Sequence, residues 1–386
     1  MSASTYAVYA IGCQQNWYDA EKVAHALDSA GLFPASTDEA ELIIILACSV
    51  RQKAVDRIFG LIDKWRQKKA QHIVVSACVL PADRDRVAAK ADALVSEDKL
   101  IPYLSEYIGQ PLTGEIGSHR NGTNTQHPAQ HTFIPITIGC NNFCTFCAVP
   151  HTRGREQSRP KTLILTEIAG AIKRGMTHIT LLGQNVNSYG LSDFSPRDLR
   201  KNRDRSGRAW TTENPSPFVE LLRDVEKLTG LQSVAFLSSN PQDFSSDLIE
   251  WMQRSSIFSR TLNLPLQSGS DSVLKRMNRR YSKTEYLELV RQLRQAVPDL
   301  ILTSDIIVGF PGETDDDFAS TLTVAQEANF AKVFTGIYSP RPGTVSAELY
   351  EDDVPPNVKH NRWQQIEDCF NHQKTALNPA TGDRLF

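Results

Sequence analysis

Six of the seven cysteines in the 386-residue chain form two groups of three, and these groups constrain the fold more than any other feature. The first group, Cys13, Cys48 and Cys78, has intervals of 35 residues (13 to 48) and 30 residues (48 to 78). The second group, Cys140, Cys144 and Cys147, lies within one short segment. The chain shows no signal stretch, so we expect a cytoplasmic protein. Cysteines of cytoplasmic proteins typically bind metals or take part in catalysis and do not form structural disulfides.

The composition indicates a folded globular protein with two or three domains. The chain is 40% hydrophobic and 22% charged and has a formal net charge of −2, values that exclude a mainly disordered chain. Its longest apolar run, 42–47, is too short to span a bilayer, so we expect no membrane association. The small net charge also excludes nucleic-acid binding through an overall positive field, and any such contact needs a local basic patch.

Short apolar runs alternate with longer amphipathic segments in residues 1–112, which we expect to form the first domain. The runs predict three buried strands, at Tyr6–Ile11, Leu42–Leu46 and His72–Ala77. The segments between them predict helices at Asp19–Ala30 and Arg51–Lys69. Alternating strands and helices are typical of a parallel α/β sheet.

Each cysteine of the first group directly follows one of these three strands. Because the carboxyl ends of neighbouring parallel strands meet at one sheet edge, the thiols of Cys13, Cys48 and Cys78 should be neighbours in space. We therefore predict a three-thiolate iron–sulfur cluster with one open iron. The alternative is three buried structural cysteines, since free cysteine is commonly buried.

A polar linker is predicted at 113–130, and a second α/β domain at 131–346. Six strands are expected in that domain, at Phe133–Ile138, His178–Leu182, Ser233–Leu237, Thr261–Leu264, Leu300–Val308 and Lys332–Ile337. The main helices between them are expected at Leu163–Arg174, Pro217–Leu228 and Glu285–Ala296. Such repeats predict a partial or full parallel barrel with its functional groups at the carboxyl ends of the strands. Residues 347–386 should add one helix, at Val358–Thr375, where Cys369 is expected to be a packing residue.

The second cysteine group follows the first strand of this domain with the spacing C-x3-C-x2-C. Three thiolates this close on a loop can ligate three irons of one four-iron cluster and leave the fourth iron open to a substrate. A zinc site with His151 as fourth ligand is the alternative.

The spacing, with Phe146 before the last cysteine, resembles the radical S-adenosylmethionine (SAM) superfamily. Two cysteine groups in this order resemble its methylthiotransferases. The matching motifs are GCQQNWYDAE, CSVRQKA, GCNNFCTFCAVPHTRGREQSRP, LLGQNVNSYG, LPLQSGSDSVLKRMNRRY, DIIVGFPGET and YSPRPGT. QNVNSYG and VPHTRGRE are most similar to the branch that modifies isopentenyladenosine beside the tRNA anticodon.

The resemblance implies two [4Fe-4S] clusters and SAM. SAM would be cleaved to a 5′-deoxyadenosyl radical at the second cluster, and the first cluster would carry the sulfur that is methylated. Residues expected to contact SAM are Phe146, Gln184, Asn185, Ser238, Gln267, Gly309 and Glu313. Strand-end polar residues can also cap helices, and Glu313 can begin one, so structural roles remain open for them.

Arginine and lysine residues beyond the cysteine loop could bind RNA phosphate. Those expected to do so are Arg153, Arg155, Arg159, Arg200, Lys201, Arg203 and Arg341. Three of them belong to the basic stretch 197–208. Internal ion pairs and simple solvation are the alternatives.

We therefore expect an enzyme that adds a 2-methylthio group to isopentenyladenosine at position 37 of tRNA. Alternatives are threonylcarbamoyladenosine or a ribosomal protein as substrate, and a non-catalytic iron–sulfur RNA-binding protein. The expected partners are the tRNA anticodon loop and a flavodoxin- or ferredoxin-like electron donor, and the expected state is a monomer. The small C-terminal β-barrel (TRAM) that usually ends such proteins is not expected here.

Overall fold

The computed structural model describes residues 3–48, 52–113, 130–192, 203 and 208–371. The chain divides into two compact units, which are treated separately below. The first contains Met1–His127, Cys147–Gly154 and Arg341–Thr344. The second contains Pro128–Phe146, Arg155–Pro340 and Val345–Phe386. The predicted linker lies almost entirely outside the described residues, and the predicted C-terminal extension belongs to the second unit.

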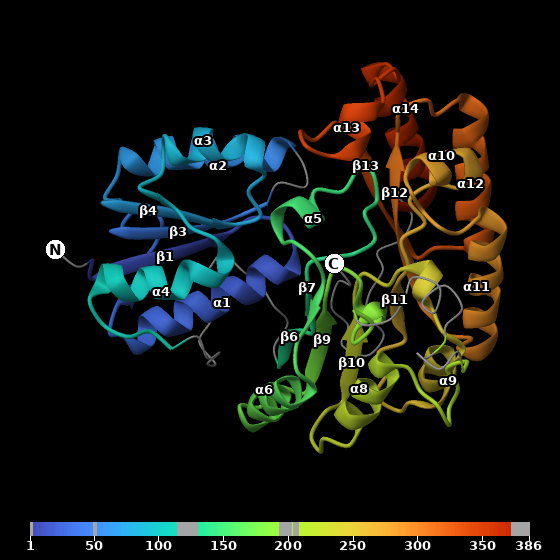
Figure 1. Ribbon diagram of the computed structural model, residues 1–386, viewed down its shortest axis with the longest axis horizontal. Coiled ribbons are helices and arrows are strands. Elements are labelled where there is room, and N and C mark those ends of the chain that lie inside the picture. The colour runs from blue at the N-terminus through green and yellow to red at the C-terminus, as the bar shows by residue number, and fades with distance from the viewer. Residues whose placement is uncertain (1–2, 49–51, 114–129, 193–202, 204–207, 372–386) are drawn as a thin grey trace. The chain divides into compact units, whose positions relative to one another are not determined.

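The first unit is a parallel sheet with helices on both faces. Its strands, in the order β2-β1-β3-β4-β5, are β1 (Thr5–Ala10), β2 (Phe33–Pro34), β3 (Leu42–Ala47), β4 (His72–Ala77) and β5 (Ala93–Leu94). Its main helices are α1 (Gln14–Ser29), α2 (Gln52–Arg66), α3 (Pro81–Ala88) and α4 (Glu97–Ile108). Figure 1 shows α1 and α4 on one face of the sheet and α2 and α3 on the other.

Side chains of alternating direction along β3 fill the two cores of this unit. Ile44 and Leu46 belong to the core beneath α1 and α4, whereas Ile43 and Ile45 belong to the core beneath α2 and α3. Every residue of β3 is buried, as expected for a central parallel strand covered on both faces. The sequence-predicted parallel α/β fold of this region is confirmed.

The second unit contains two three-stranded parallel sheets. The strands are β6 (His131–Pro135), β9 (His178–Leu182), β10 (Ser233–Phe236), β11 (Thr261–Asn263), β12 (Ile301–Val308) and β13 (Lys332–Ile337). The strand orders are β10-β9-β6 and β11-β12-β13, and a parallel bridge from Val234 to Phe258 joins β10 to the segment before β11. This arrangement corresponds to the partial form of the predicted βα barrel.

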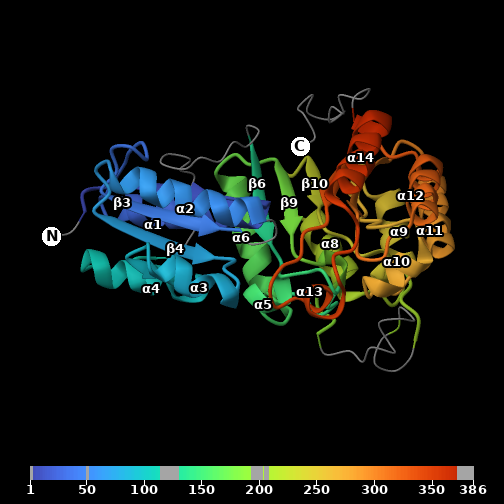
Figure 2. The same cartoon turned by 90° about the horizontal axis from the view of Figure 1, so that it is seen from above.

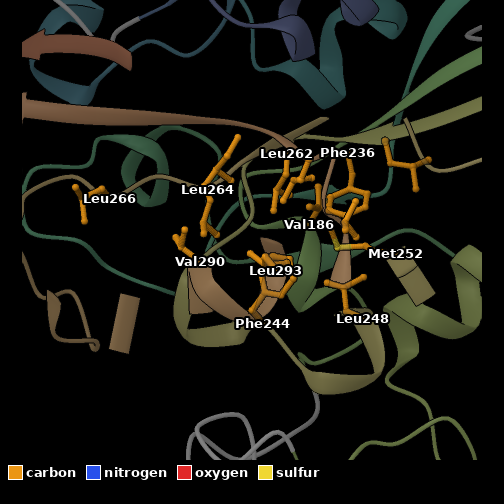
Figure 3. Close-up of a cluster of buried hydrophobic side chains, with 14 of the residues drawn as sticks. Val186, Phe236, Phe244, Leu248, Met252, Leu262, Leu264, Leu266, Val290 and Leu293 are labelled. Carbon is orange, nitrogen blue, oxygen red and sulfur yellow. The ribbon is translucent and has the colours of Figure 1, made fainter. Parts of the chain in front are cut away.

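Helices cover the outer side of these sheets. They are α6 (Lys161–Lys173), α8 (Pro217–Glu226), α9 (Ser246–Arg254), α10 (Asp271–Arg276), α11 (Lys283–Ala296), α12 (Asp315–Ala328) and α14 (Pro356–Ile366). Helices α11 and α12 lie side by side (Figures 1 and 2). Side chains such as Phe236, Met252, Leu262 and Leu293 meet between helices and strands in one continuous apolar core (Figure 3).

The largest difference from the predicted elements is at 133–138. The expected single strand is divided into β6 and β7 (Thr137–Ile138), and β7 pairs antiparallel with β8 (Gln157–Ser158). Pro135 is the last residue of β6, and the N–H of Ile136 makes the last bond to β9, to the carbonyl of Leu182 at 2.8 Å. Within the described residues, no helix has both the length and the apolar character needed to cross a bilayer.

Candidate metal centres

The first cysteine group lies at the carboxyl edge of the first unit's sheet. Strands β1, β3 and β4 are adjacent, and their registers align Ala10 with Leu46 and Ala47 with Ala77. Cys13, Cys48 and Cys78 therefore follow three neighbouring strand ends, as the sequence spacing predicts. The backbone N–H of Cys78 donates to the carbonyl of Ala47 at 3.2 Å, which ties the third cysteine to the strand that carries the second.

Glycine 12 allows two of these cysteines to come together. Its φ is +111°, and a side-chain Cβ at this position would lie 2.6 Å from the Cβ and 2.7 Å from the Sγ of Cys48. Any larger residue would displace the Cys48 thiol from the turn that carries Cys13. Ala77 has a φ of +71° just before Cys78, so two of the three thiols follow a left-handed residue.

Asn16, in the first turn of α1, holds two of the strand ends. Its buried Nδ2 donates to the carbonyls of Ile11 at 2.7 Å and Ala47 at 2.8 Å. These carbonyls lie just after β1 and at the end of β3, where the sheet ladder ends. The side chain therefore fixes the spacing of the Cys13 and Cys48 turns.

Arg153 lies against this cysteine group, with a side chain only 2% exposed. Its Nε donates to Cys78 Sγ at 3.0 Å, and a terminal nitrogen donates to Asn16 Oδ1 at 2.7 Å. Ion pairs to Glu97 at 3.0 Å and Asp19 at 3.5 Å hold the remainder of the guanidinium. These contacts correspond to the internal ion-pair alternative for Arg153, not to a surface contact with RNA.

Burial raises the pKa values of two groups at this edge. The pKa of Cys78 is raised mainly by burial and also by the nearby Cys13, whereas Arg153 lowers it. The pKa of Asp19 is raised to about 7 by burial and by Glu97, again with Arg153 opposing the shift. The arginine is therefore the main nearby group that favours the thiolate form of Cys78, which metal ligation needs.

The donor set at this edge fits an iron–sulfur cluster. Three thiols from adjacent strand ends, one of them hydrogen-bonded to a guanidinium, match a three-cysteine cluster with one open iron. No group of three or more His, Cys, Asp or Glu side chains among the described residues could hold a single metal ion. The ligands of a four-iron cluster bind different irons and need not converge on one point, unlike those of zinc.

The second cysteine group begins directly after β7. Cys140 is 8% exposed, and Cys144 and Cys147 are half-buried. Burial raises the pKa of Cys140 to about 12, and the neighbouring Cys144, Glu156 and Asp243 add to this effect. A thiol so strongly disfavoured as a free anion is stabilised as a thiolate when it binds iron.

The segment after α10 holds the loop that carries Cys140 and Cys144. The backbone N–H of Thr145 donates to the carbonyl of Met277 at 3.1 Å, and its hydroxyl donates to the carbonyl of Arg276 at 2.8 Å. Asn278 Nδ2 donates to the carbonyl of Phe143 at 2.9 Å. Residues of the motif RMNRR thus fix the conformation of the cysteine loop through these hydrogen bonds.

Arg279, in the same motif, contacts the second cysteine group. Its guanidinium donates to Cys144 Sγ at 3.4 Å, to the Tyr281 hydroxyl at 3.0 Å and to the carbonyl of Pro265 at 3.4 Å. In the sequence it lies in the motif LPLQSGSDSVLKRMNRRY, between the basic residues Lys275 and Arg280. Its contact with a cysteine depends on the fold and could not be predicted from that motif.

Polar atoms without partners lie at the carboxyl ends of the second unit's strands. Asn185 Oδ1, Ser239 Oγ and Gln267 Oε1 are buried and have no hydrogen-bond partner within the described part of the chain. Such atoms are costly unless something bonds to them. The rim therefore fits a polar ligand such as SAM, whose amino, carboxylate and ribose groups form hydrogen bonds.

Two acids also lie near this rim. Glu156 accepts a hydrogen bond from Ser188 at 2.7 Å, and burial with the nearby Asp243 raises its pKa to about 7. Asp243 accepts from Asn185 Nδ2 at 2.6 Å. Neither acid was singled out from the sequence, although Glu156 lies in the motif TRGRE.

The other residues predicted to contact SAM differ in environment. Gln184 and Ser238 are half-buried, and Phe146 packs with the buried side chains of Met277, Phe310 and Tyr338. Glu313 accepts from the N–H of Gly309 at 2.6 Å and from Arg362 at 2.8 Å.

Glu313 thus has internal partners for one oxygen, whereas its Oε1 has none in the described residues. Gly309 has a φ of +70°, and a Cβ there would lie 2.3 Å from Lys359. The contact roles of these residues with SAM remain predictions.

The basic residues predicted to bind RNA are either paired with an acidic residue, exposed, or outside the described residues. Arg341 is 2% exposed and pairs with Asp83 at 3.2 Å, so it has an internal role like that of Arg153. Arg159 pairs with Glu167 at 2.7 Å. Arg155 is exposed over the Phe143 ring, and Arg203 is exposed. Arg200 and Lys201 lie outside the described residues.

Comparison with known proteins matches two segments of the chain to known families. Residues 134–325 match the family described as the Radical SAM superfamily, and residues 5–96 match Uncharacterized protein family UPF0004. A radical S-adenosylmethionine methyltransferase from Kitasatospora setae shares the fold, with a TM-score of 0.55 at 12% identity over 89% of this chain and 75% of that one.

Two curated relatives match nearly the whole chain. Both are tRNA-2-methylthio-N(6)-dimethylallyladenosine synthases. The one from Acidothermus cellulolyticus is 38% identical over 94% of this chain and 72% of its own length. The one from Thermotoga petrophila is 36% identical over 95% and 82%, respectively. With its two cysteine groups and radical SAM fold, the chain belongs to the family of these tRNA methylthiotransferases within the radical SAM superfamily.

Proposed function

We propose that this protein adds a methylthio group to carbon 2 of N(6)-dimethylallyladenosine (isopentenyladenosine) next to the anticodon of tRNA. The observation that carries the proposal is the pair of three-cysteine groups, of which one follows three adjacent parallel strands of the first unit and the other begins after β7. The names of the relatives supply the substrate. One group alone would suit SAM cleavage but would leave the added sulfur without a carrier.

Residues of the second unit hold and orient the reagent. A reduced four-iron cluster with an open iron supplies the electron that cleaves SAM when both are bound. Cys140 and Cys144 of this unit, together with Cys147 of the segment Cys147–Gly154, would provide its thiolates. Asn185 Oδ1, Ser239 Oγ and Gln267 Oε1, which have no partner among the described residues, are available to hydrogen-bond SAM and to fix its orientation.

Residues of the first unit hold the sulfur carrier. Cys13, Cys48 and Cys78 would ligate a second cluster, whose open iron is the place for a transferable sulfur. Arg153 directs its Nε at Cys78, and Asn16 fixes the strand ends on either side. The first unit thus supports the sulfur and the second supports the radical chemistry.

The tRNA substrate requires an unstacked base, because the reacting carbon must reach a group that the protein holds. A single-stranded loop meets this requirement at lower cost than a duplex. We propose that the basic stretch 197–208 and the exposed Arg155 contact phosphates of that loop. Replacing the six basic residues of 197–208 should weaken tRNA binding and reduce its salt dependence, and unchanged affinity would exclude that stretch.

The proposed reaction is tested by mass spectrometry of tRNA nucleosides. The chain is expressed in a bacterial strain that lacks its own methylthiotransferase but makes isopentenyladenosine. We expect 2-methylthio-isopentenyladenosine to appear with the wild-type chain and to be absent with Cys78→Ala or Cys144→Ala. The matched control is Cys369→Ala. Cys369 is exposed, so the prediction that it is a packing residue is wrong, and it lies away from both cysteine groups in sequence.

The same measurement separates the alternatives. A methylthio group on threonylcarbamoyladenosine, or on a ribosomal protein with unmodified tRNA, would contradict the substrate proposed here. A protein that binds iron and tRNA but releases no 5′-deoxyadenosine with SAM and reductant would be a non-catalytic binder. The electron donor is proposed to be a flavodoxin- or ferredoxin-like protein and can be identified by the reductant that supports turnover.

A further inference from the structure

The guanidinium of Arg153 has contacts with four residues of the first unit. It donates to Cys78 Sγ and Asn16 Oδ1 and pairs with Glu97 and Asp19, and only 2% of the side chain is exposed. A guanidinium presents its donors in a rigid plane, so partners on several sides fix its orientation as well as its position. The hydrogen bond to Cys78 is therefore held by the surrounding contacts.

A fixed positive charge beside a thiolate ligand has a defined effect on an iron–sulfur cluster. Hydrogen bonds to the sulfurs and nearby charge are among the factors that set its reduction potential. Reduction adds a negative charge, and a guanidinium 3.0 Å from a ligand sulfur stabilises the more negative state. Arg153 should thus make the first cluster easier to reduce than the same cluster without it.

The carboxylates around Arg153 moderate this effect without removing it. Glu97 is 28% exposed and Asp19 is 10% exposed, so solvent screens the first more than the second. Burial and Glu97 raise the pKa of Asp19, which leaves it partly protonated near neutral pH. The guanidinium is therefore incompletely compensated on the side that faces Cys78.

We infer that Arg153 is a positioning residue for the cluster at Cys13, Cys48 and Cys78, fixing the Cys78 thiolate and raising the reduction potential of that cluster. This inference rests on the proposed function, because it requires that these cysteines carry a cluster. It assigns to Arg153 a role different from RNA binding. The sequence places Arg153 six positions after Cys147, so one short segment serves both cysteine groups.

The test uses the full chain with Cys140, Cys144 and Cys147 replaced by alanine, so that only the first cluster is reconstituted. Its midpoint potential is measured anaerobically by electron paramagnetic resonance at a series of poised potentials, without SAM or tRNA. Arg153→Gln should lower the equilibrium constant for one-electron reduction at least tenfold, equivalent to about 59 mV. Arg153→Lys keeps the charge but not the planar contacts and should give an intermediate shift.

The matched control is Arg57→Gln, which removes the same charge from an exposed position in the first unit. It should leave the midpoint unchanged. If Arg153→Gln fails to fold or to bind iron, the midpoint potential of Arg153→Lys is the test. An arginine with a purely structural role would give a wild-type midpoint potential in Arg153→Lys once the cluster is bound.

A cluster with an unchanged midpoint in the arginine variants overturns the inference and leaves the proposed function intact. Failure of the triple-alanine chain to bind any cluster overturns both. A lowered midpoint supports the inference even if wild-type protein modifies a different substrate, because no substrate enters the measurement.

Discussion

The two cysteine groups reach similar chemistry by different structural routes. Cys140, Cys144 and Cys147 are close because they are close in sequence, whereas Cys13, Cys48 and Cys78 meet only because β1, β3 and β4 are adjacent. The first route needs one anchored loop. The second needs the whole sheet, including Gly12 and Asn16, which set the turns after the strands. A short cysteine motif can therefore be found by spacing, while a dispersed group is recognised only together with its fold.

In each group one arginine is hydrogen-bonded to a cysteine, and the two arginines differ in their other partners. Arg153 is held by the carboxylates Glu97 and Asp19, whereas Arg279 is held by the neutral Tyr281 hydroxyl and the Pro265 carbonyl. The charge at the first group thus faces two carboxylates that compensate it in part, whereas the anchors of Arg279 include no carboxylate.

The largest expected effect separates the roles of the two groups. Cys78→Ala and Cys144→Ala should each abolish methylthiolation, but only Cys144→Ala should also abolish formation of 5′-deoxyadenosine from SAM. The reason is that SAM cleavage needs the second cluster alone. Chromatography of anaerobic reactions with dithionite measures this product. Loss of 5′-deoxyadenosine in both variants would contradict separate roles.

The next effect concerns stability and the two arginines. Arg153→Met leaves Glu97 and Asp19 without their cation, so we expect a loss of about 3–5 kcal/mol in the free energy of unfolding. Arg279→Met leaves no carboxylate unpaired, only the Tyr281 hydroxyl, the Pro265 carbonyl and the long contact to Cys144, and should cost about 1–3 kcal/mol. Urea unfolding followed by tryptophan fluorescence compares the two under anaerobic conditions. Equal losses would show that the carboxylates do not depend on Arg153.

The sequence predicted the parts of this molecule that depend on local patterns. Buried strands such as 72–77 were found at their observed bounds because they are short, apolar and bounded by turns. The alternation of strands and helices also predicted that the dispersed cysteines lie at one edge of the sheet. The radical SAM fold and the family are confirmed by the comparisons, while the roles of individual site residues remain predictions.

The contacts of Arg153 and Arg279 could not be predicted, because their partners are distant in sequence. Arg153 bonds to Cys78 across 75 positions and Arg279 to Cys144 across 135. An arginine in a basic motif resembles a phosphate ligand until the fold shows a carboxylate or a thiol beside it. The GCQQNWYDAE motif did contain Asn16 and Asp19, but only the structure shows their partners.

A smaller effect compares the two asparagines that hold the cysteine segments. Asn16→Ala leaves the buried carbonyls of Ile11 and Ala47 unpaired and should cost about 1–3 kcal/mol. Asn278→Gly exposes the carbonyl of Phe143 to water at an exposed position and should cost less than about 1 kcal/mol. Glycine is chosen because Asn278 has a φ of +57°. Urea unfolding midpoints measure the loss of stability in both variants. A larger loss in Asn278→Gly than in Asn16→Ala would contradict this prediction.

The smallest effect is a pH dependence that each unit should show through one buried acid. The pKa values of Asp19 and Glu156 are both raised to about 7, above those of the unfolded chain. Between about pH 4 and 7 the folded protein therefore retains protons that the unfolded chain releases, and stability falls as pH rises. Between pH 6 and 7 the free energy of unfolding should fall with rising pH, and each of these acids should contribute about 1 kcal/mol to that fall. Asp19→Asn and Glu156→Gln should each abolish the contribution of the acid that is replaced.

The two effects should add in the double variant, because the acids belong to different units. Urea unfolding at the two pH values measures them, and a wild-type slope in Asp19→Asn would show that Arg153 keeps Asp19 ionised. In that case the guanidinium would be fully compensated, and its influence on Cys78 would be reduced to the hydrogen bond alone. The pH series therefore sets how much of the difference between the two cysteine groups is due to charge.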